Sequence, residues 1–106
     1  MGLKDKLKEC GSDMLFEAVL TLENMEECYA FFEDLCTATE LTAMAQRFHV
    51  AYLLKQDVIY NEIAAKTGAS TATISRVNKS LIYGEDGYKT AISRLIELNK
   101  LPDDWK

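Results

Sequence analysis

The sequence predicts an all-α protein with six helices, and three observations favour this class. Apolar residues recur at helical spacing almost throughout the 106 residues. No stretch alternates apolar and polar residues for long enough to make a convincing strand. The single proline, Pro102, follows the last predicted helix and prevents its continuation. Because 48% of the residues are apolar and 27% are charged, residues 1–106 are expected to fold as a single domain.

Two amphipathic helices are expected in the first part of the chain. Ser12 or Asp13 can cap the first, and Asn24 can cap the second, where Glu26 and Glu27 suit the helix dipole. Both helices have apolar faces wider than one neighbour covers in a small domain. The surplus predicts a homodimer, and a compact monomer with the same residues in its core is the alternative. The expected dimer-interface residues are Leu15, Phe16, Val19, Leu20, Phe31 and Phe32.

The longest helix is expected from Thr39, its N-cap, to Lys55. With the first two helices it makes up the predicted dimerisation segment, residues 12–55. A fourth and a fifth helix follow within residues 60–83. The glycine-containing segment 84–87 then forms a loop, and the sixth helix is expected over residues 87–100.

The most informative stretch is YNEIAAKTGASTATISRVNK, which begins at Tyr60. Two short helices that meet at a steep angle need a small residue at their contact, a glycine at the turn and apolar residues at fixed offsets. Gly68 supplies the turn. Only Thr67 departs from the helix-turn-helix pattern, because an aliphatic residue is commoner there. The other slots are filled by Ile63, Ala64, Ala69, Ile74 and Val77.

The second helix of this unit has a face suited to DNA. With Ile74, Val77 and Leu81 turned inward, the remaining positions are small, hydroxylic or basic. Small side chains allow the helix start to approach base edges in the major groove, and basic ones can contact phosphates. Asn61, at the start of the preceding helix, can reach a phosphate. The predicted DNA-binding residues are Asn61, Ser70, Thr71, Ala72, Thr73, Ser75, Arg76 and Lys79.

The run GASTATISRVNKSL, preceded by QRFHVAYLLKQDVIYNEIAAKTG, resembles the tryptophan repressor superfamily. With LFEAVLTLENMEECYAFFEDLCT, it is similar to the YerC/YecD group of that superfamily, over about residues 12–98. The resemblance implies a six-helix chain that forms an intertwined homodimer, in which the N-terminal helices of two subunits wrap around each other. It also implies a transcriptional regulator that binds a palindromic operator, with one helix-turn-helix from each subunit.

The resemblance does not extend to the tryptophan site. The tryptophan repressor holds its co-repressor between two arginines, beside a glycine that leaves room for the indole. Arg76 matches one arginine, but Gln46 stands in place of the other and Val77 replaces the glycine. Arg47 is one residue away, which turns it about 100° around the helix and off the required face. We therefore expect no response to tryptophan, and the sequence identifies no other effector.

Other residues carry weaker signals. His49 lacks a nucleophile motif and is best interpreted as a structural histidine, so we expect no enzyme. Cys10, Cys28 and Cys36 form no C-x-x-C pair and are expected to be reduced thiols. No metal site or cofactor is expected. Without a spanning or signal-like apolar segment, the protein is expected to be cytoplasmic and away from membranes. Trp105 is expected to pack on a partner subunit or to be mobile.

The net charge of −5 is unevenly distributed. Residues 1–59 contain 5 basic and 11 acidic side chains, whereas residues 60–83 contain 3 basic and 1 acidic. An acidic scaffold with a small basic face predicts low affinity for random DNA and strong dependence on two correctly spaced half-sites. The alternative function is a dimeric helical adaptor that keeps the fold and docks a protein without operator binding.

Overall fold

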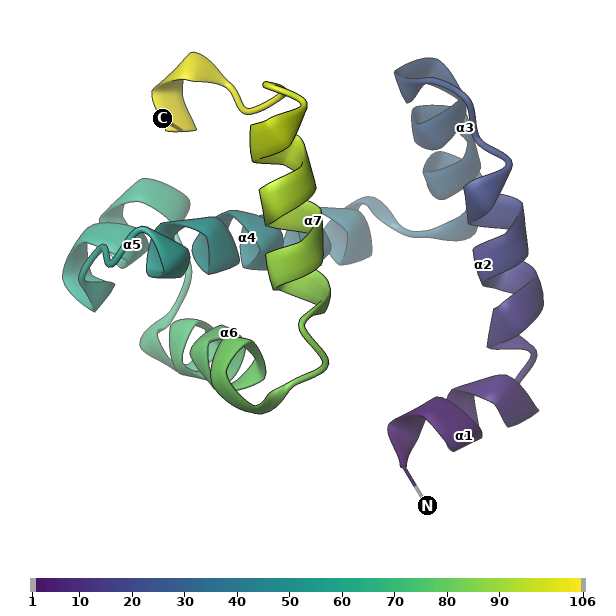
Figure 1. Cartoon of the computed structure of the whole chain (residues 1–106), viewed down its shortest axis with the longest axis horizontal. Coiled ribbons are helices and arrows are strands. Elements are labelled where there is room, and N and C mark those ends of the chain that lie inside the picture. The colour runs from purple at the N-terminus through teal and green to yellow at the C-terminus, as the bar shows by residue number, and fades with distance from the viewer. Residues whose placement is uncertain (1, 106) are drawn as a thin grey trace. The chain divides into compact units, whose positions relative to one another are not determined.

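The computed structural model describes residues 2–105, and all regular secondary structure within that range is helical. The all-α class is confirmed. The count of six is wrong, because the described residues form seven α-helices and a short 3-10 helix (Figure 1). The elements are α1 (Leu3–Glu9), α2 (Ser12–Leu20), α3 (Met25–Leu35), α4 (Ala38–Lys55), α5 (Tyr60–Thr67), α6 (Thr71–Tyr83), α7 (Gly87–Glu97) and the 3-10 helix η1 (Asp103–Trp105).

The additional helix is α1, whose short charged sequence gave no clear apolar stripe. Its charges nevertheless suit a helix, because Asp5 lies in the first turn while Lys6 and Lys8 lie in the last. Gly11, with φ of +81°, separates α1 from α2 in a left-handed conformation. A helix of seven residues with no buried side chain is therefore formed by dipole-matched charges and a glycine boundary.

The N-caps of α3 and α4 are both side-chain caps. The Asn24 side chain accepts a hydrogen bond from the Glu27 N–H at 2.9 Å, as predicted. For α4 the prediction of Thr39 is wrong. Thr37 Oγ1 accepts from the Glu40 N–H at 3.1 Å, and Glu40 Oε1 accepts from the Thr37 N–H at 2.8 Å. This reciprocal capping box starts the helix at Ala38.

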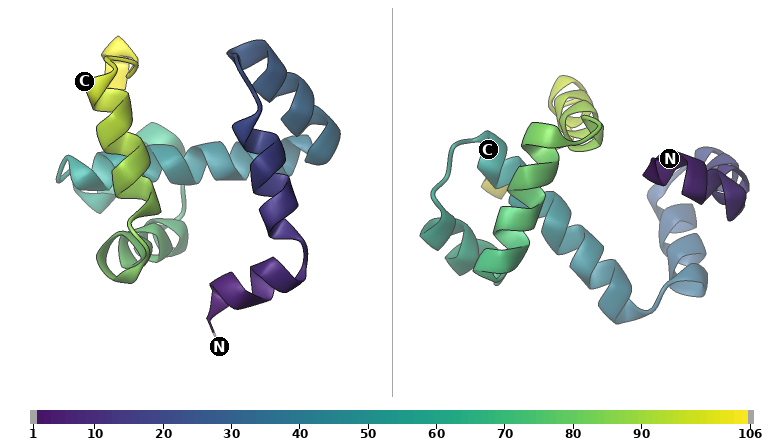
Figure 2. Two further views of the ribbon diagram at one scale, coloured as in Figure 1. Left: turned by 45° about the vertical axis from the view of Figure 1, so that its right-hand side comes forward. Right: turned by 90° about the horizontal axis from the view of Figure 1, so that it is seen from below.

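The described chain divides into two compact units, the first ending at Leu41 and the second beginning at Thr42. In the first unit, α1 and α3 extend from opposite ends of α2 (Figures 1 and 2). None of the described residues of α1, α2 and α3 is buried. Several large apolar side chains on these helices are exposed, so the first unit has no hydrophobic core of its own.

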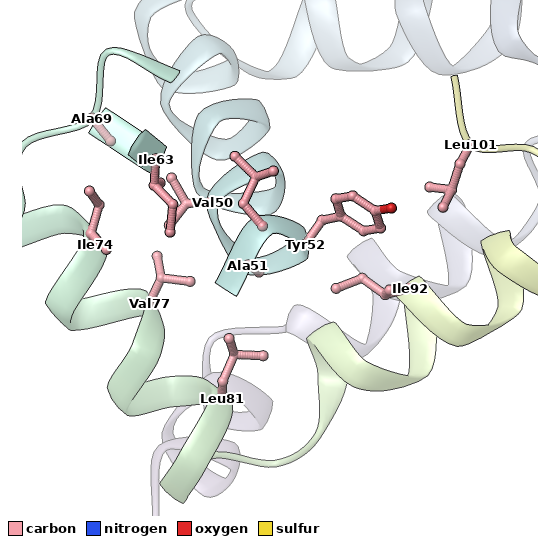
Figure 3. Packing of buried hydrophobic residues seen from close by; sticks show 11 residues of the cluster. Val50, Ala51, Tyr52, Ile63, Ala69, Ile74, Val77, Leu81, Ile92 and Leu101 are labelled. Carbon is pink, nitrogen blue, oxygen red and sulfur yellow. The ribbon is translucent and has the colours of Figure 1, made fainter. Parts of the chain in front are cut away.

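The second unit contains the hydrophobic core. Figure 3 shows α4 contributing Val50, Ala51 and Tyr52 to a cluster with side chains from α5, α6 and α7. The prediction that Ile74, Val77 and Leu81 point inward is confirmed, since they are 0%, 2% and 7% exposed. The other buried members are Leu53, Ile63, Ala69, Ile92 and Leu101.

Two helices of this unit end in the same motif. At the end of α4, the Val58 N–H donates to the Leu53 carbonyl, and Asp57 has φ of +60°. At the end of α7, the Lys100 N–H donates to the Leu95 carbonyl, and Asn99 has φ of +53°. These Schellman ends use residues that tolerate the left-handed conformation. The sixth predicted helix, 87–100, therefore ends earlier than expected, before Pro102 is reached.

Candidate nucleic-acid interface

Helices α5 and α6 form the predicted helix-turn-helix with the predicted limits. α5 ends at Thr67, and Gly68 follows with φ of +75°, where its N–H donates to the Ala64 carbonyl at 2.8 Å. A residue with a side chain would be strained at this φ. Ala69 is buried in the turn, as the pattern requires. The turn therefore connects α5 and α6 with a buried alanine at its centre.

Two hydroxyl groups hold the start of α6. Ser70 Oγ accepts a hydrogen bond from the Thr73 N–H at 3.1 Å, and it lies 3.1 Å from Thr73 Oγ1. Ser70 is therefore the N-cap, and the hydroxyl of the half-buried Thr73 supports the cap. These two members of the predicted set fix the end of the helix that would approach base edges.

The other predicted DNA-binding residues are exposed. They lie on α6 outside its buried stripe, apart from Asn61, which lies in the first turn of α5. No acidic residue occurs within α6, and Glu62 is the acidic residue of α5. The face therefore presents hydroxyl, methyl and cationic groups. Its exposed residues are Asn61, Ser70, Thr71, Ala72, Ser75, Arg76 and Lys79.

Arg76 lies at two adjacent concavities. One, of about 280 Å³, is lined by Arg76, Lys79, Ser80 and neighbouring residues of the end of α6. The other, of about 230 Å³, is lined by Arg47, Arg76, Val77, Ser80 and Tyr88. Arg47 therefore shares a pocket with Arg76, and the expectation that it points off this face is wrong. Rotation about α4 alone does not locate the guanidinium, because the long arginine side chain can extend around the helix.

Gln46 has a role that the sequence did not indicate. Its Nε2 donates a hydrogen bond to the Thr67 carbonyl at 3.1 Å. Gln46 lies on α4 and Thr67 closes α5, so the bond joins the scaffold to the turn. A polar residue on a helix surface gives no sequence signal for a partner 21 positions away.

The C-terminal Trp105 packs within its own chain. Its ring stacks on His49 with centroids 4.1 Å apart and an interplanar angle of 1°. Tyr52 and Phe48 lie at the same ring, with centroids 5.3 and 6.4 Å away. Neither expectation for Trp105, a partner contact or mobility, matches this packing. Desolvation by burial lowers the pKa of His49, and Lys66 acts in the same direction, while Asp104 opposes both.

Between residues 2 and 105, no group of three or more histidine, cysteine or acidic side chains is arranged to hold a metal ion. Cys10, Cys28 and Cys36 are free thiols. Within the same range, no helix combines the length and the apolar character that a membrane crossing requires.

Comparisons with known proteins agree with this geometry. The chain is 50% identical over 93 residues to the uncharacterized protein YerC of Bacillus subtilis (strain 168). The aligned region covers 88% of this chain and 89% of YerC. The crystal structure of a candidate Trp repressor from Staphylococcus aureus superimposes with a TM-score of 0.84 at 46% identity, covering 97% of this chain and all of that one. A TrpR-like protein from Eubacterium eligens ATCC 27750 gives a TM-score of 0.82 at 48% identity, covering 93% and 99%.

The sequence model of the family described as Trp repressor protein matches residues 11–96. This match includes α2 to α6 and nearly all of α7, and therefore the entire helix-turn-helix. It indicates a DNA-binding regulatory protein of the helix-turn-helix class. The chain belongs to the Trp repressor protein family.

Proposed function

We propose that the protein is a sequence-specific transcriptional regulator that binds an inverted-repeat operator as a homodimer. The observation that carries the proposal is the exposed face of α6. Its buried stripe of Ile74, Val77 and Leu81 fixes the helix on the core. The opposite side, without acidic residues, is left free to enter a major groove.

Each part of this face has a proposed role. Thr71, Ala72 and Ser75 are small and exposed near the start of α6, where they would meet base edges. Arg76 and Lys79 are exposed further along and would contact phosphates, with Asn61 reaching a phosphate from α5. Ser70 and Thr73 would act through the N-cap, because their hydroxyls already bond to each other.

The proposed homodimer rests on the first unit. Phe16 is 52% exposed and Leu20 is 78% exposed, although both are large and apolar. A second copy of the chain would cover them, together with Leu15, Val19, Phe31 and Phe32. Two copies related by a two-fold axis would read half-sites about one helical turn, or 34 Å, apart.

We further propose that tryptophan does not regulate this protein. Val77 is 2% exposed and occupies the position where the tryptophan repressor has a glycine. Gln46 is already bonded to the Thr67 carbonyl. Calorimetric titration with tryptophan is expected to show no binding at micromolar concentrations, and micromolar affinity would overturn this part of the proposal. The pocket between Arg47 and Arg76 is where such binding would have to occur.

The central test measures DNA affinity against salt. An operator would first be selected from a random oligonucleotide pool. If Arg76 and Lys79 contact phosphates, each change to alanine weakens binding to operator and random duplex alike. In the proposed homodimer each change removes one phosphate contact per subunit, so the slope of log K against log[salt] becomes shallower by about two units.

Arg94→Ala and Lys100→Ala, outside α6, serve as controls of equal charge and should leave both quantities unchanged. Unchanged affinity in the Arg76→Ala, Lys79→Ala double variant would contradict the proposed face. If the wild-type chain shows no salt-dependent binding to any duplex, the adaptor alternative replaces the regulator.

A second arm tests base recognition. Thr71→Val and Ser75→Ala remove hydroxyl groups without changing charge, so the salt slope is expected to stay constant. The sequence preference should change, because hydroxyls that bond to base edges determine which base is accepted. Repeating the oligonucleotide selection with each variant measures this. Recovery of the same preferred sequence from both variants would remove these residues from the reading face.

A further inference from the structure

The hydrogen bond from Gln46 is unusual among the side-chain hydrogen bonds described for residues 2–105. Ten others join residues only two to four positions apart, nine of them at helix ends or turns and one, from Ser93 Oγ to the Thr90 carbonyl, within α7. The bond from Gln46 Nε2 to the Thr67 carbonyl spans 21 positions and connects two helices. It is a tertiary contact made by a polar group in a unit whose core is otherwise apolar.

The acceptor of this bond lies where α5 ends and the turn of the helix-turn-helix begins. Thr67 is the last residue of α5, where carbonyl groups have no partner within the helix. Its hydroxyl donates to the Ile63 carbonyl at 2.8 Å and accepts from the Ala69 N–H at 3.1 Å. Thr67 therefore bonds back into α5, forward across the turn and sideways to α4.

This network explains the departure of Thr67 from the usual pattern. An aliphatic residue would pack at this position but would leave the Ala69 N–H without its hydroxyl acceptor. Gln46 lies against the same turn, since a Cβ placed on Gly68 would be 3.9 Å from Gln46 Nε2. The turn therefore has both hydrogen bonds, through Thr67 and Gln46, and a buried alanine, Ala69.

We infer that Gln46 is a positioning residue that fixes the start of α6 relative to α4. α4 contributes Val50, Ala51, Tyr52 and Leu53 to the core, so a bond from α4 connects the turn to the helix that contributes these four buried residues. A recognition helix that is already held in its binding position loses less conformational freedom when it binds. Specific contacts also require that position to be accurate. The inference rests on the proposed DNA-reading function of α6 and adds the residue that orients this helix.

Three substitutions separate the hydrogen bond from side-chain size. Gln46→Met keeps a similar length and removes the donor. Gln46→Glu keeps the shape and places an acceptor against the Thr67 carbonyl. Gln46→Lys restores a donor. Gln56→Met and Gln56→Lys make the same chemical changes at the exposed end of α4 and serve as matched controls.

The first measurement needs no DNA. Amide hydrogen exchange of the free protein should become about 2- to 10-fold faster at Gly68, Ala69 and the first turn of α6 in the Met and Glu variants, the range expected for loss of one net hydrogen bond. Exchange of core amides such as that of Ile92 should stay the same. The Lys variant should recover the slow exchange at the turn, which a size effect would not produce.

The second measurement compares selected operator with random duplex. In the Met and Glu variants the ratio of operator affinity to random-duplex affinity should fall about 2- to 10-fold. Only the base-specific contacts depend on the orientation of α6. Unchanged exchange at the turn, or an unchanged affinity ratio, overturns the role of Gln46 while leaving the proposed function intact. If the wild-type protein binds neither duplex, the proposed function fails and the inference fails with it.

Discussion

His49 illustrates how much a single contact can determine. The residue is half-buried under Trp105, and desolvation lowers the pKa of its imidazole. Asp104 raises this pKa and Lys66 lowers it, so the charges of η1 and α5 act in opposite directions. Protonation of His49 is therefore less favourable in the folded chain than in the unfolded chain. The stacked pair links the stability of the C-terminal segment to pH.

The sign of this dependence follows from linkage. Because the folded pKa of His49 is below the unfolded value of about 6.5, the unfolded chain binds more protons as pH falls through that value. The melting temperature is expected to fall between pH 7.5 and pH 5.5. Circular dichroism melts of wild type and His49→Phe, which keeps a ring but does not titrate, measure the effect. An equal fall in the variant would exclude His49 as its origin.

Glu40 acts in a different pH range. Hydrogen bonds from the Thr37 backbone and side chain lower the pKa of this exposed carboxylate from its usual value of 4.5. Its contribution is present above that value and is lost as pH falls through the lowered pKa. The His49 window therefore lies above the range in which the capping box of α4 weakens.

Single residues were predictable where a short pattern determines them. Gly68 at the turn and Asn24 at the N-cap of α3 were assigned correctly, because turn and cap signals depend on immediate neighbours. Arg47, Gln46 and Trp105 could not be placed, because their partners are 20 or more residues away. Thr37 was passed over for Thr39, although the Thr37 to Glu40 spacing is that of a capping box.

At the scale of elements, the two helices expected within residues 60–83 are present as α5 and α6, and α1 was missed. α5 and α6 have apolar residues at fixed offsets that are all buried in the structure or half-buried, as Ala64 is. α1 has only Leu3 and Leu7 at helical spacing, which is too short an apolar pattern to detect. Detection from sequence therefore depends on the length of the apolar stripe, which α2 and α3 have although none of their described residues is buried.

The inward face of α6 predicts a clear mutational contrast. Ile74→Ala should lower the free energy of unfolding by about 2–5 kcal/mol, because the side chain is fully buried and its removal leaves a cavity. Ile59→Ala removes the same atoms from a side chain that is 68% exposed, and should change stability by only about 0.5 kcal/mol. Urea denaturation followed by circular dichroism measures both. Equal losses would contradict the described packing.

For the whole molecule, the division into two units reflects where apolar side chains are buried. The second unit buries its own, whereas α1, α2 and α3 bury none. The sequence indicated this surplus through Phe16, Leu20 and Phe31, which do not fit one stripe. It could not divide the chain at Leu41, because α4 is a continuous helix across that point.

The proposed homodimer leads to a prediction for the whole assembly. Leu20→Glu places a charge on a side chain that is 78% exposed in the single chain and would be covered in the dimer. Analytical ultracentrifugation should show a dimer for wild type and a monomer for this variant. Operator affinity should fall with it, since one half-site remains. Gln56→Glu adds the same charge to the second unit and should stay dimeric; loss of the dimer there too would implicate charge alone.

The ion pair of α7 lies at the surface. Lys89 Nζ is 3.4 Å from Asp86 Oδ1, and the two side chains are 45% and 68% exposed. Such a pair contributes little to stability, and the buried cluster is apolar. Because the core is apolar, we expect the fold to tolerate changes in ionic strength. A salt titration of this protein on DNA then counts displaced counterions directly, with no correction for partial unfolding.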